Sequence, residues 1–326
     1  METGAGQSGR RGSRPENAKR GLMKLVQFYT PDQGTRLGLL YDGLVHDLTE
    51  VEPAYYSFMA LLERAGGQAA TLERFVREKG ARVPEQAIFE WEELDRPPDP
   101  SFPHLLMPVF SPEVWGFGVT YRRSAETRDA DHHVQNMANI YDRVYNSERP
   151  ECFFKATAAR CVGPNGHIGI RSDSELTATE PELAFVLGAN KEIIGFTICN
   201  DVSAWDLERQ NPLYLPQSKI YAGCCALGPA VVTMTEITDP YSLNISCRVI
   251  RGSKAIFSGS TNSGLIGRTF EELIEYLYRD NPIPLGTVVS TGTGIMVPNE
   301  LCLRDGDLVE IEIDGIGRLS NPVRKL

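Results

Sequence analysis

Acidic residues inside an apolar strand constrain this chain more than any other feature. Residues 180–187 form a short apolar run bounded by turn residues, which predicts a β-strand. Side chains alternate between the two faces of a strand, so Glu180 and Glu182 are expected on one face. A second apolar run, residues 193–199, follows a short link that contains glycine and asparagine, and the two runs together predict a hairpin.

The register of this hairpin decides whether a third carboxylate joins the first two. If Asn190 and Lys191 are the two loop residues, Asp201 lies directly opposite Glu180, and all three carboxylates share one face. A slip of one residue would bring Asn200 to that place instead. The arrangement of three carboxylates therefore depends on the register.

Three carboxylates packed together repel one another. At about 4 Å and an effective dielectric constant of roughly 20, each like-charged pair costs on the order of 4 kcal/mol. A divalent cation offsets this repulsion, and an all-oxygen ligand set suits Mg²⁺, with Mn²⁺ and Ca²⁺ as alternatives. A solvated acidic strand face is the other interpretation. The apolar residues 183–186 favour a buried strand, whose carboxylates need a partner.

Four motifs follow one another along the chain: a Glu-x-Glu strand, an Asn-Asp-Val-Ser segment, a lysine and a Gly-Pro pair, at residues 180–182, 200–203, 219 and 228–229. As a set they resemble the fumarylacetoacetate hydrolase superfamily. Residues 211–221 resemble its 2-keto-3-deoxy-D-arabinonate dehydratase branch. The likeness extends from about residue 108 to the C-terminus.

The resemblance implies roles for carboxylates and lysines in these motifs. It implies that the metal is held by Glu180, Glu182 and Asp201, with Glu151 as a further ligand. Lys155, on the same strand face as Glu151, is then expected to face the substrate. A structural salt bridge is the alternative for this lysine.

Lys219 precedes Gly228 by nine residues, the interval of the active-site lysine in the family that the chain resembles. If a nearby Mg²⁺ and burial lower its pKa, Lys219 can serve as the base, or as the acid for a leaving hydroxyl. A Schiff base on Lys219 is another alternative, although it would be redundant beside a metal.

A loop of small residues, 290–294, is the expected substrate-binding segment. Its glycines, Gly292 among them, let backbone N–H groups approach a ligand, and the hydroxyls of Thr291 and Thr293 can bind a carboxylate. Tyr121 is a further expected substrate contact. An ordinary tight turn is the alternative for the loop.

The chain departs from the hydrolases of this superfamily at the positions of their catalytic dyad. Those members carry a Gly-x-Asn-Tyr-x-x-His-x-x-Glu pattern in which the histidine is the base. Here Ser124 stands in place of the histidine and Thr127 in place of the glutamate. Trp205 and Ala222 replace an arginine and an aspartate, which affects contacts with the substrate. The missing dyad favours the dehydratase branch.

Composition restricts the partners and the location of the protein. A formal net charge of −10 argues against nucleic acid or an anionic membrane as a partner. No apolar run reaches the length of a transmembrane helix. Seven cysteines, an odd number without a C-x-x-C pair, indicate neither a disulfide framework nor a zinc site. We therefore expect a reducing compartment, the cytoplasm. The resemblance, and not the composition, implies a small-molecule 2-keto acid as the partner.

The 326 residues allow one large and one small domain. Residues 1–22 carry almost nothing apolar and are expected to be disordered. Residues 23–100 predict a small α+β N-terminal domain, and a proline-rich linker ends near residue 108. Residues 108–326 would form the catalytic domain. The fold class is thus α+β, and the resemblance implies a β-rich mixed β-roll that assembles as a homodimer or homotetramer.

Residues 121–145 predict a helix or a helical lid over this domain. His132 and His133 are adjacent within it, so they point to different helix faces and cannot both serve one site.

The implied chemistry is the dehydration of a 2-keto-3-deoxy sugar acid to 2,5-dioxopentanoate. A base removes a proton from C3, the C4 hydroxyl leaves, and the C4–C5 enol tautomerises. An acylpyruvate hydrolase or oxaloacetate decarboxylase would use the same metal and is the alternative among enzymes. A catalytically silent protein that binds a 2-keto acid is the alternative from another class.

Overall fold

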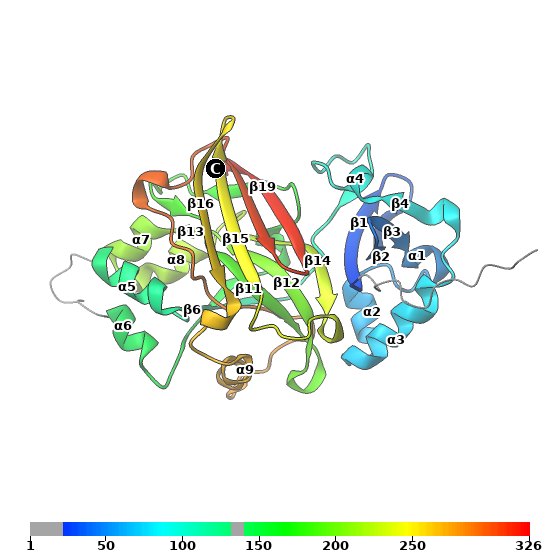
Figure 1. Ribbon diagram of the computed structural model, residues 1–326, viewed down its shortest axis with the longest axis horizontal. Helices are drawn as coiled ribbons and strands as arrows, with labels where there is room; N and C mark the ends of the chain where they lie inside the picture. Colours follow the sequence, from blue (N-terminus) through cyan, green and yellow to red (C-terminus); the bar gives the residue numbers. More distant parts are fainter. Residues whose placement is uncertain (1–21, 132–139) are drawn as a thin grey trace, which may run out of the picture.

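The computed structural model describes residues 22–131 and 140–326, with the side chains of residues 127–131 left out (Figure 1). His132 and His133 lie outside the described residues, as does nearly all of the predicted extension 1–22. The helix expected over residues 121–145 is described as two segments, α5 (Arg122–Asp131) and α6 (Ile140–Tyr145).

Within the described residues, one large mixed sheet of twelve strands runs through both halves of the molecule. Its main path follows the order β4-β3-β2-β1-β14-β12-β11-β17-β6-β7, and β5 and β8 pair with β1 and β14. The strands span β1 Lys24–Thr30, β2 Gly34–Tyr41, β3 Leu44–Asp47, β4 Ile88–Glu90, β5 His104–Leu105, β6 Val114–Gly118, β7 Glu151–Ala156, β8 Cys161–Val162, β11 Pro181–Leu187, β12 Ile193–Asp201, β14 Cys225–Thr233 and β17 Val288–Ser290.

A second sheet packs against the middle of the first, in front of it in Figure 1. Its order is β16-β15-β18-β19-β9, and a separate pair joins β10 to β13. A buried cluster fills the space between the sheets, with Leu183 and Phe185 from β11 meeting Ile245 and Ile311. These strands are β9 Ile168–Ile170, β10 Thr177–Ala178, β13 Ser203–Ala204, β15 Asn244–Arg251, β16 Lys254–Asn262, β18 Leu308–Ile313 and β19 Gly317–Lys325.

Helices gather at the two ends of the molecule (Figure 1). The first four accompany β1–β4 at one end, and α5–α8 lie together at the other. Phe58 and Leu61 of α2 are buried with Leu25 of β1 and with Val186 and Val231 of the central strands. The remaining bounds are α1 Leu48–Val51, α2 Phe58–Arg64, α3 Ala69–Gly80, α4 Trp91–Leu94, α7 Trp205–Gln210, α8 Leu215–Lys219 and α9 Phe270–Tyr278.

The fold class predicted from the sequence, a β-rich α+β structure, is confirmed. β1 pairs with β14, however, so the strands of the N-terminal region belong to the same sheet as the central strands. The division into two domains near residue 100 stays a prediction.

The predicted register of the β11–β12 hairpin is confirmed. The antiparallel pairing runs without a shift from Pro181 to Val186, in the register that sets Asp201 opposite Glu180. The Asp201 N–H donates to the Glu180 carbonyl at 3.0 Å. The two carboxylate-bearing residues are therefore cross-strand neighbours.

The turn of the hairpin is built from the two residues that the register required. Asn190 and Lys191 have positive φ angles of 54° and 68°, and the Glu192 N–H donates to the Ala189 carbonyl at 3.0 Å. Positive φ at both central residues is the mark of a type I′ turn, whose twist matches that of the flanking strands. Asparagine tolerates this conformation well, which explains its place here.

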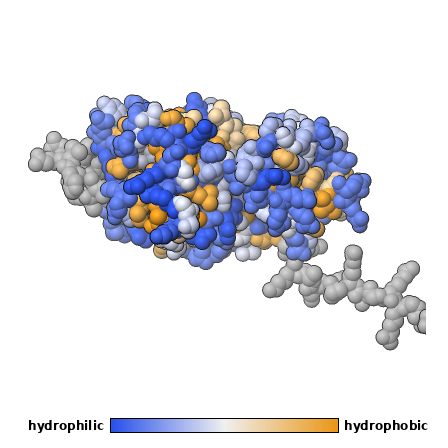
Figure 2. Space-filling model, turned by 90° about the horizontal axis from the view of Figure 1, so that it is seen from above, coloured by the Kyte–Doolittle hydropathy of each residue, from blue (hydrophilic) through white to orange (hydrophobic). Residues whose placement is uncertain are grey.

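Polar residues cover most of the face in Figure 2, with apolar residues in small separate groups among them. No helix within the described ranges is both long and apolar enough to cross a membrane.

Candidate metal centre and active site

Three carboxylates converge where β11 begins and β12 ends. Ligand atoms of Glu180, Glu182 and Asp201 lie within 4.8 Å of one another, and this group could hold a metal ion. All three residues are at most 3% exposed. Burial without compensation would make such a group very costly, so each oxygen must be matched by a donor or a cation.

Lys219 supplies one positive charge to this group. It is the last residue of α8 and is 3% exposed. Its Nζ lies 3.0 Å from Glu180 Oε2 and 2.8 Å from Asp201 Oδ2, and it donates to the Ser203 hydroxyl at 2.7 Å. The structure thus brings the predicted lysine into direct contact with two of the predicted metal ligands.

Lys155 lies behind Asp201 and is completely buried. Its Nζ is 2.5 Å from Asp201 Oδ1 and donates to the carbonyls of Val202 and Lys219 at 2.9 and 2.7 Å. An ammonium has three donors, and these contacts use all of them. These contacts agree with the salt-bridge alternative for Lys155, and a role toward the substrate stays a prediction.

The two lysines affect the three carboxylates unequally. Burial alone would raise the pKa of Asp201, but the ion pairs with Lys155 and Lys219 outweigh it and lower the pKa to about 2. Burial, followed by repulsion from Asp201 and Glu180, raises the pKa of Glu182 to about 8. A third negative charge is therefore unfavourable at Glu182 in the metal-free site, and a divalent cation would relieve the repulsion that opposes it.

Two further groups orient the glutamates. The Trp205 indole N–H donates to Glu180 Oε1 at 2.7 Å, and the Ser290 hydroxyl donates to Glu182 Oε2 at 2.5 Å. Trp205 stands where the resemblance led us to expect an arginine. The indole is a neutral donor, so the glutamate is held in place without another positive charge.

The loop after β17 contributes backbone as well as side chains. The Gly292 N–H donates to Glu182 Oε2 at 2.7 Å. Gly292 has a φ of +88°, and a Cβ there would collide with the Thr120 hydroxyl, so glycine is required. Thr293 and Gly292 line the pocket that contains Glu180, Glu182, Asp201 and Lys219, which we call the acidic pocket. Thr291 does not line this pocket, because its hydroxyl donates to the Leu183 carbonyl of β11 at 2.8 Å.

Glu151, at the start of β7, lines the same pocket but lies outside the tight group of three carboxylates. It is paired with Gly118 of β6, where a Cβ would run into the Glu151 carboxylate. The absence of a side chain at Gly118 therefore leaves the space that the Glu151 carboxylate occupies.

Tyr121 and Ser124 are buried beside the pocket. The Tyr121 hydroxyl has no hydrogen-bond partner among the described residues, and burial followed by repulsion from Glu182 raises its pKa. Ser124 lines the pocket at the place of the hydrolase histidine. The side chain of Thr127 is not among those described.

Analysis of the sequence assigned no role to Ser203 or Glu208. It singled out Trp205 and the loop that contains Ser290 for the substrate, but not for the hydrogen bonds that they donate to Glu180 and Glu182. Ser203 could have been inferred, because it follows Asp201 by two residues and so repeats its strand face. Glu208, which lines the acidic pocket from α7, carried no such signal because its position depends on how that short helix packs.

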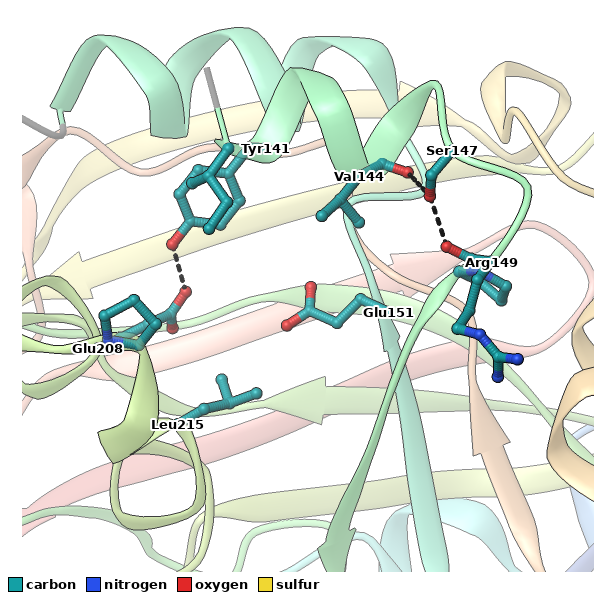
Figure 3. A pocket seen from close by; sticks show the side chains of 10 residues that line it. Tyr141, Val144, Ser147, Arg149, Glu151, Glu208 and Leu215 are labelled. Carbon is teal, nitrogen blue, oxygen red and sulfur yellow. Dashed lines mark hydrogen bonds between the residues drawn. The ribbon is translucent and has the colours of Figure 1, made fainter. Parts of the chain in front are cut away.

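A larger cavity of about 440 Å³ adjoins the acidic pocket (Figure 3). Glu151 and Glu208 line both spaces, so they mark the junction between them. The cavity therefore offers space for a small organic molecule directly beside the pocket that contains the three carboxylates.

Comparison with known proteins identifies relatives of this chain. Residues 113–324 match the model of the fumarylacetoacetate (FAA) hydrolase C-terminal family. A 2-dehydro-3-deoxy-D-arabinonate dehydratase of Saccharolobus solfataricus is 52% identical over 68% of this chain and 74% of its own length. A probable 2-keto-3-deoxyxylonate dehydratase of Haloferax volcanii is 38% identical over 88% of this chain and 95% of its own.

A solved structure of 2-keto-3-deoxy-D-arabinonate dehydratase, complexed with magnesium and 2,5-dioxopentanoate, superimposes with a TM-score of 0.76. It is 39% identical and covers 93% of this chain and 99% of its own. Motifs, fold and matched length agree, and this chain belongs to the fumarylacetoacetate hydrolase family.

Proposed function

We propose that this protein is a Mg²⁺-dependent dehydratase that converts a 2-keto-3-deoxy sugar acid, such as 2-keto-3-deoxy-D-arabinonate, to 2,5-dioxopentanoate. The observation that carries the proposal is the buried group of Glu180, Glu182 and Asp201, whose pocket adjoins a cavity of about 440 Å³. Relatives that resemble it over most of its length are a dehydratase and a probable dehydratase of such acids, and a solved structure of a 2-keto-3-deoxy-D-arabinonate dehydratase contains magnesium and this product.

The three carboxylates, with Glu151 at the edge, would hold the metal. Their donors are all oxygen, as hard divalent cations prefer, and Mg²⁺ fits better than a softer metal. When bound, Mg²⁺ supplies Lewis-acid polarisation of a 2-keto acid, which makes its C3 protons more acidic. The raised pKa of Glu182 supports the fit, because burial and then the neighbouring carboxylates disfavour its negative charge, and a bound cation would offset both.

Lys219 would handle the proton of the leaving group. Its ammonium donates to Glu180 and Asp201, so it carries a proton within the pocket and can act as an acid. A base takes the C3 proton as the C3–H bond breaks, the C3–C4 double bond forms as the C4–O bond breaks, and the hydroxide leaves as water with a proton from Lys219. The alkene then rearranges through the C4–C5 enol to the aldehyde, with no gain or loss of electrons.

Other pocket residues would position the substrate. Thr293 and the Tyr121 hydroxyl are candidates for its oxygen atoms, Tyr121 because its buried hydroxyl still has a hydrogen bond to give. Lys155 would act through Asp201 and the backbone of Lys219 and would not touch the substrate.

Assembly and location belong to the proposal as well. A homodimer or homotetramer is the expected assembly, because the family resemblance implies it. The cytoplasm is the expected location, since all seven cysteines are free.

Turnover assays with a substrate panel test the function. The purified protein is mixed with 2-keto-3-deoxy acids, acylpyruvates and oxaloacetate, each with Mg²⁺ and with a chelator. We expect Mg²⁺-dependent dehydration of the sugar acids, abolished by the chelator, and negligible cleavage of acylpyruvates, because Ser124 lacks an activating base. Brisk acylpyruvate cleavage would overturn the assignment, and binding without turnover of any substrate would indicate the silent binding protein.

A further inference from the structure

The cavity beside the acidic pocket has a mostly apolar lining that includes two carboxylates. In Figure 3, Glu151 and Glu208 reach into it from β7 and α7. Its lining is Ile140, Tyr141, Val144, Ser147, Arg149, Pro150, Glu151, Glu208, Pro212 and Leu215. A substrate whose keto-acid end occupies the acidic pocket must extend its other end past these two carboxylates.

Glu208 is fixed in this position by its surroundings. The residue is 6% exposed, and its Oε1 accepts a hydrogen bond from the Tyr141 hydroxyl at 3.2 Å. Tyr141 belongs to α6 and Glu208 to α7, so the contact joins two helices across the cavity (Figure 3). A carboxylate held in this way is preorganised, which lowers the entropic cost of binding a ligand.

We propose that Glu208, held by Tyr141, selects the tail of the substrate: it accepts a hydrogen bond from a hydroxyl of the sugar acid and repels a second carboxylate. The inference rests on the proposed function, which sets the keto-acid end of the substrate at the metal. A carboxylate is an acceptor only, so it matches a hydroxyl donor. Glu151 nearby adds a second negative charge, and Arg149 of the same lining directs its guanidinium away from both carboxylates in Figure 3, so the two acids strengthen the exclusion of anionic tails.

This selection is chemically useful because the rival substrates differ in their tails. A 2-keto-3-deoxy pentonate ends in neutral hydroxyls, whereas oxaloacetate ends in a carboxylate. Both share the 2-keto acid group that the metal centre would bind. Glu208 would therefore provide discrimination by repulsion, in addition to the attraction that it offers to the hydroxyl.

The test uses Glu208→Gln, which keeps the shape and an acceptor for Tyr141 but removes the charge. Binding of two five-carbon 2-keto acids to the Mg²⁺-loaded protein is measured by calorimetry: 2-oxoglutarate, with an anionic tail, and 2-oxopentanoate, with a neutral one. We expect E208Q to strengthen 2-oxoglutarate binding about tenfold or more relative to 2-oxopentanoate. The kcat/KM for the sugar acid should fall about tenfold to a hundredfold, the range for one charge-assisted hydrogen bond.

Two further variants separate selection from a structural role. Tyr141→Phe should weaken selection in the same direction but less, because the carboxylate stays and only its support is lost. Gln210→Ala, at an exposed position of the same helix, should change neither quantity. A merely structural Glu208 would lower the binding of both acids together, and a 2-oxoglutarate to 2-oxopentanoate ratio within twofold of wild type in E208Q would overturn the proposal.

The proposed function and this inference can fail separately. If the wild-type protein dehydrates no sugar acid, the proposed function is wrong, while the ratio of the two binding constants still decides the role of Glu208. If dehydration occurs and the ratio is unchanged in E208Q, only the inference on tail selection is wrong.

Discussion

Two regions of the molecule bury charged side chains, and they do so in opposite ways. In the N-terminal region Arg36 pairs with Asp47, and Asp47 also caps α1 by accepting from the Thr49 and Glu50 N–H groups. Every oxygen there has a donor from its own neighbourhood. In the acidic pocket, carboxylates outnumber the lysines that touch them.

The comparison shows which kind of buried charge indicates a ligand. Burial of Asp47 raises its pKa even with Arg36 beside it, as is usual for a closed pair in the protein interior. At the pocket the shifts diverge, with the pKa of Asp201 down to about 2 and that of Glu182 up to about 8. Divergent shifts within one cluster indicate an unbalanced site, and imbalance is what a cation corrects.

The largest effect should come from Glu182→Gln. The raised pKa of Glu182 means that a neutral side chain suits the metal-free site, so this variant should fold with unchanged or higher stability. Loss of the anionic ligand should weaken Mg²⁺ binding by more than about 100-fold and abolish turnover. Calorimetric titration with Mg²⁺ checks this. Normal affinity for Mg²⁺ would show that Glu182 is not a ligand.

Lys219→Ala should leave Mg²⁺ affinity nearly intact but lower kcat by about 10²–10⁴-fold, the usual contribution of general acid–base catalysis. Lys219→Arg should not restore activity, because a guanidinium stays protonated and differs in shape. Steady-state kinetics decides the matter. A raised KM with normal kcat would assign Lys219 to substrate binding. Borohydride trapping of a substrate adduct on Lys219 would support the Schiff-base alternative.

Lys155→Met should act on stability. Removing the partner of a buried carboxylate costs about 3–5 kcal/mol of unfolding free energy, because Asp201 keeps its burial and loses an ion pair. Lys191→Met is the matched control, since the exposed Lys191–Glu275 pair should contribute less than about 1 kcal/mol. Denaturant unfolding of both variants measures the difference. Equal losses of unfolding free energy would contradict a stabilising role for the buried Lys155–Asp201 ion pair.

Asp47→Asn should have the smallest effect and none on function. The amide oxygen can still cap α1, and Arg36 keeps its contact with Glu50 at 2.9 Å. We expect a loss of about 1–3 kcal/mol in unfolding free energy, from weaker hydrogen bonds to a charged group. Mg²⁺ affinity should not change. If Mg²⁺ affinity fell with stability, the two regions would be coupled and the contrast between them would not hold.

Much of the acidic pocket could be predicted, because its main residues lie on strands. The period of two along β11 sets Glu180 and Glu182 on one face, and the loop residues Asn190 and Lys191 fix the register that adds Asp201. The role of Lys155 could not be settled in the same way. A strand pattern gives the face of a side chain, but the contacts of Lys155 with Val202 and Lys219 depend on packing between distant segments.

The fold class could also be predicted from the sequence, whereas the order of strands in the large sheet could not. Short apolar runs and turn residues predict strands, such as the two joined at Asp42 and Gly43, which have positive φ angles of 56° and 81°. Which strands then pair across two hundred residues is set by the whole core. The pairing of β1 with β14 joins strands that are distant in the sequence, and no local sequence pattern predicts it.

That pairing limits how small a working enzyme could be made. All the motifs of the acidic pocket lie after residue 108, so a truncated chain of the C-terminal two thirds would still contain every one of them. Removing β1, however, would bare the backbone of β14 near Val231, on the strand that also pairs with Asp201 through Cys225. An uncovered strand edge beside freshly exposed apolar residues invites aggregation. The N-terminal strands thus serve as a built-in cover for the sheet that carries the chemistry.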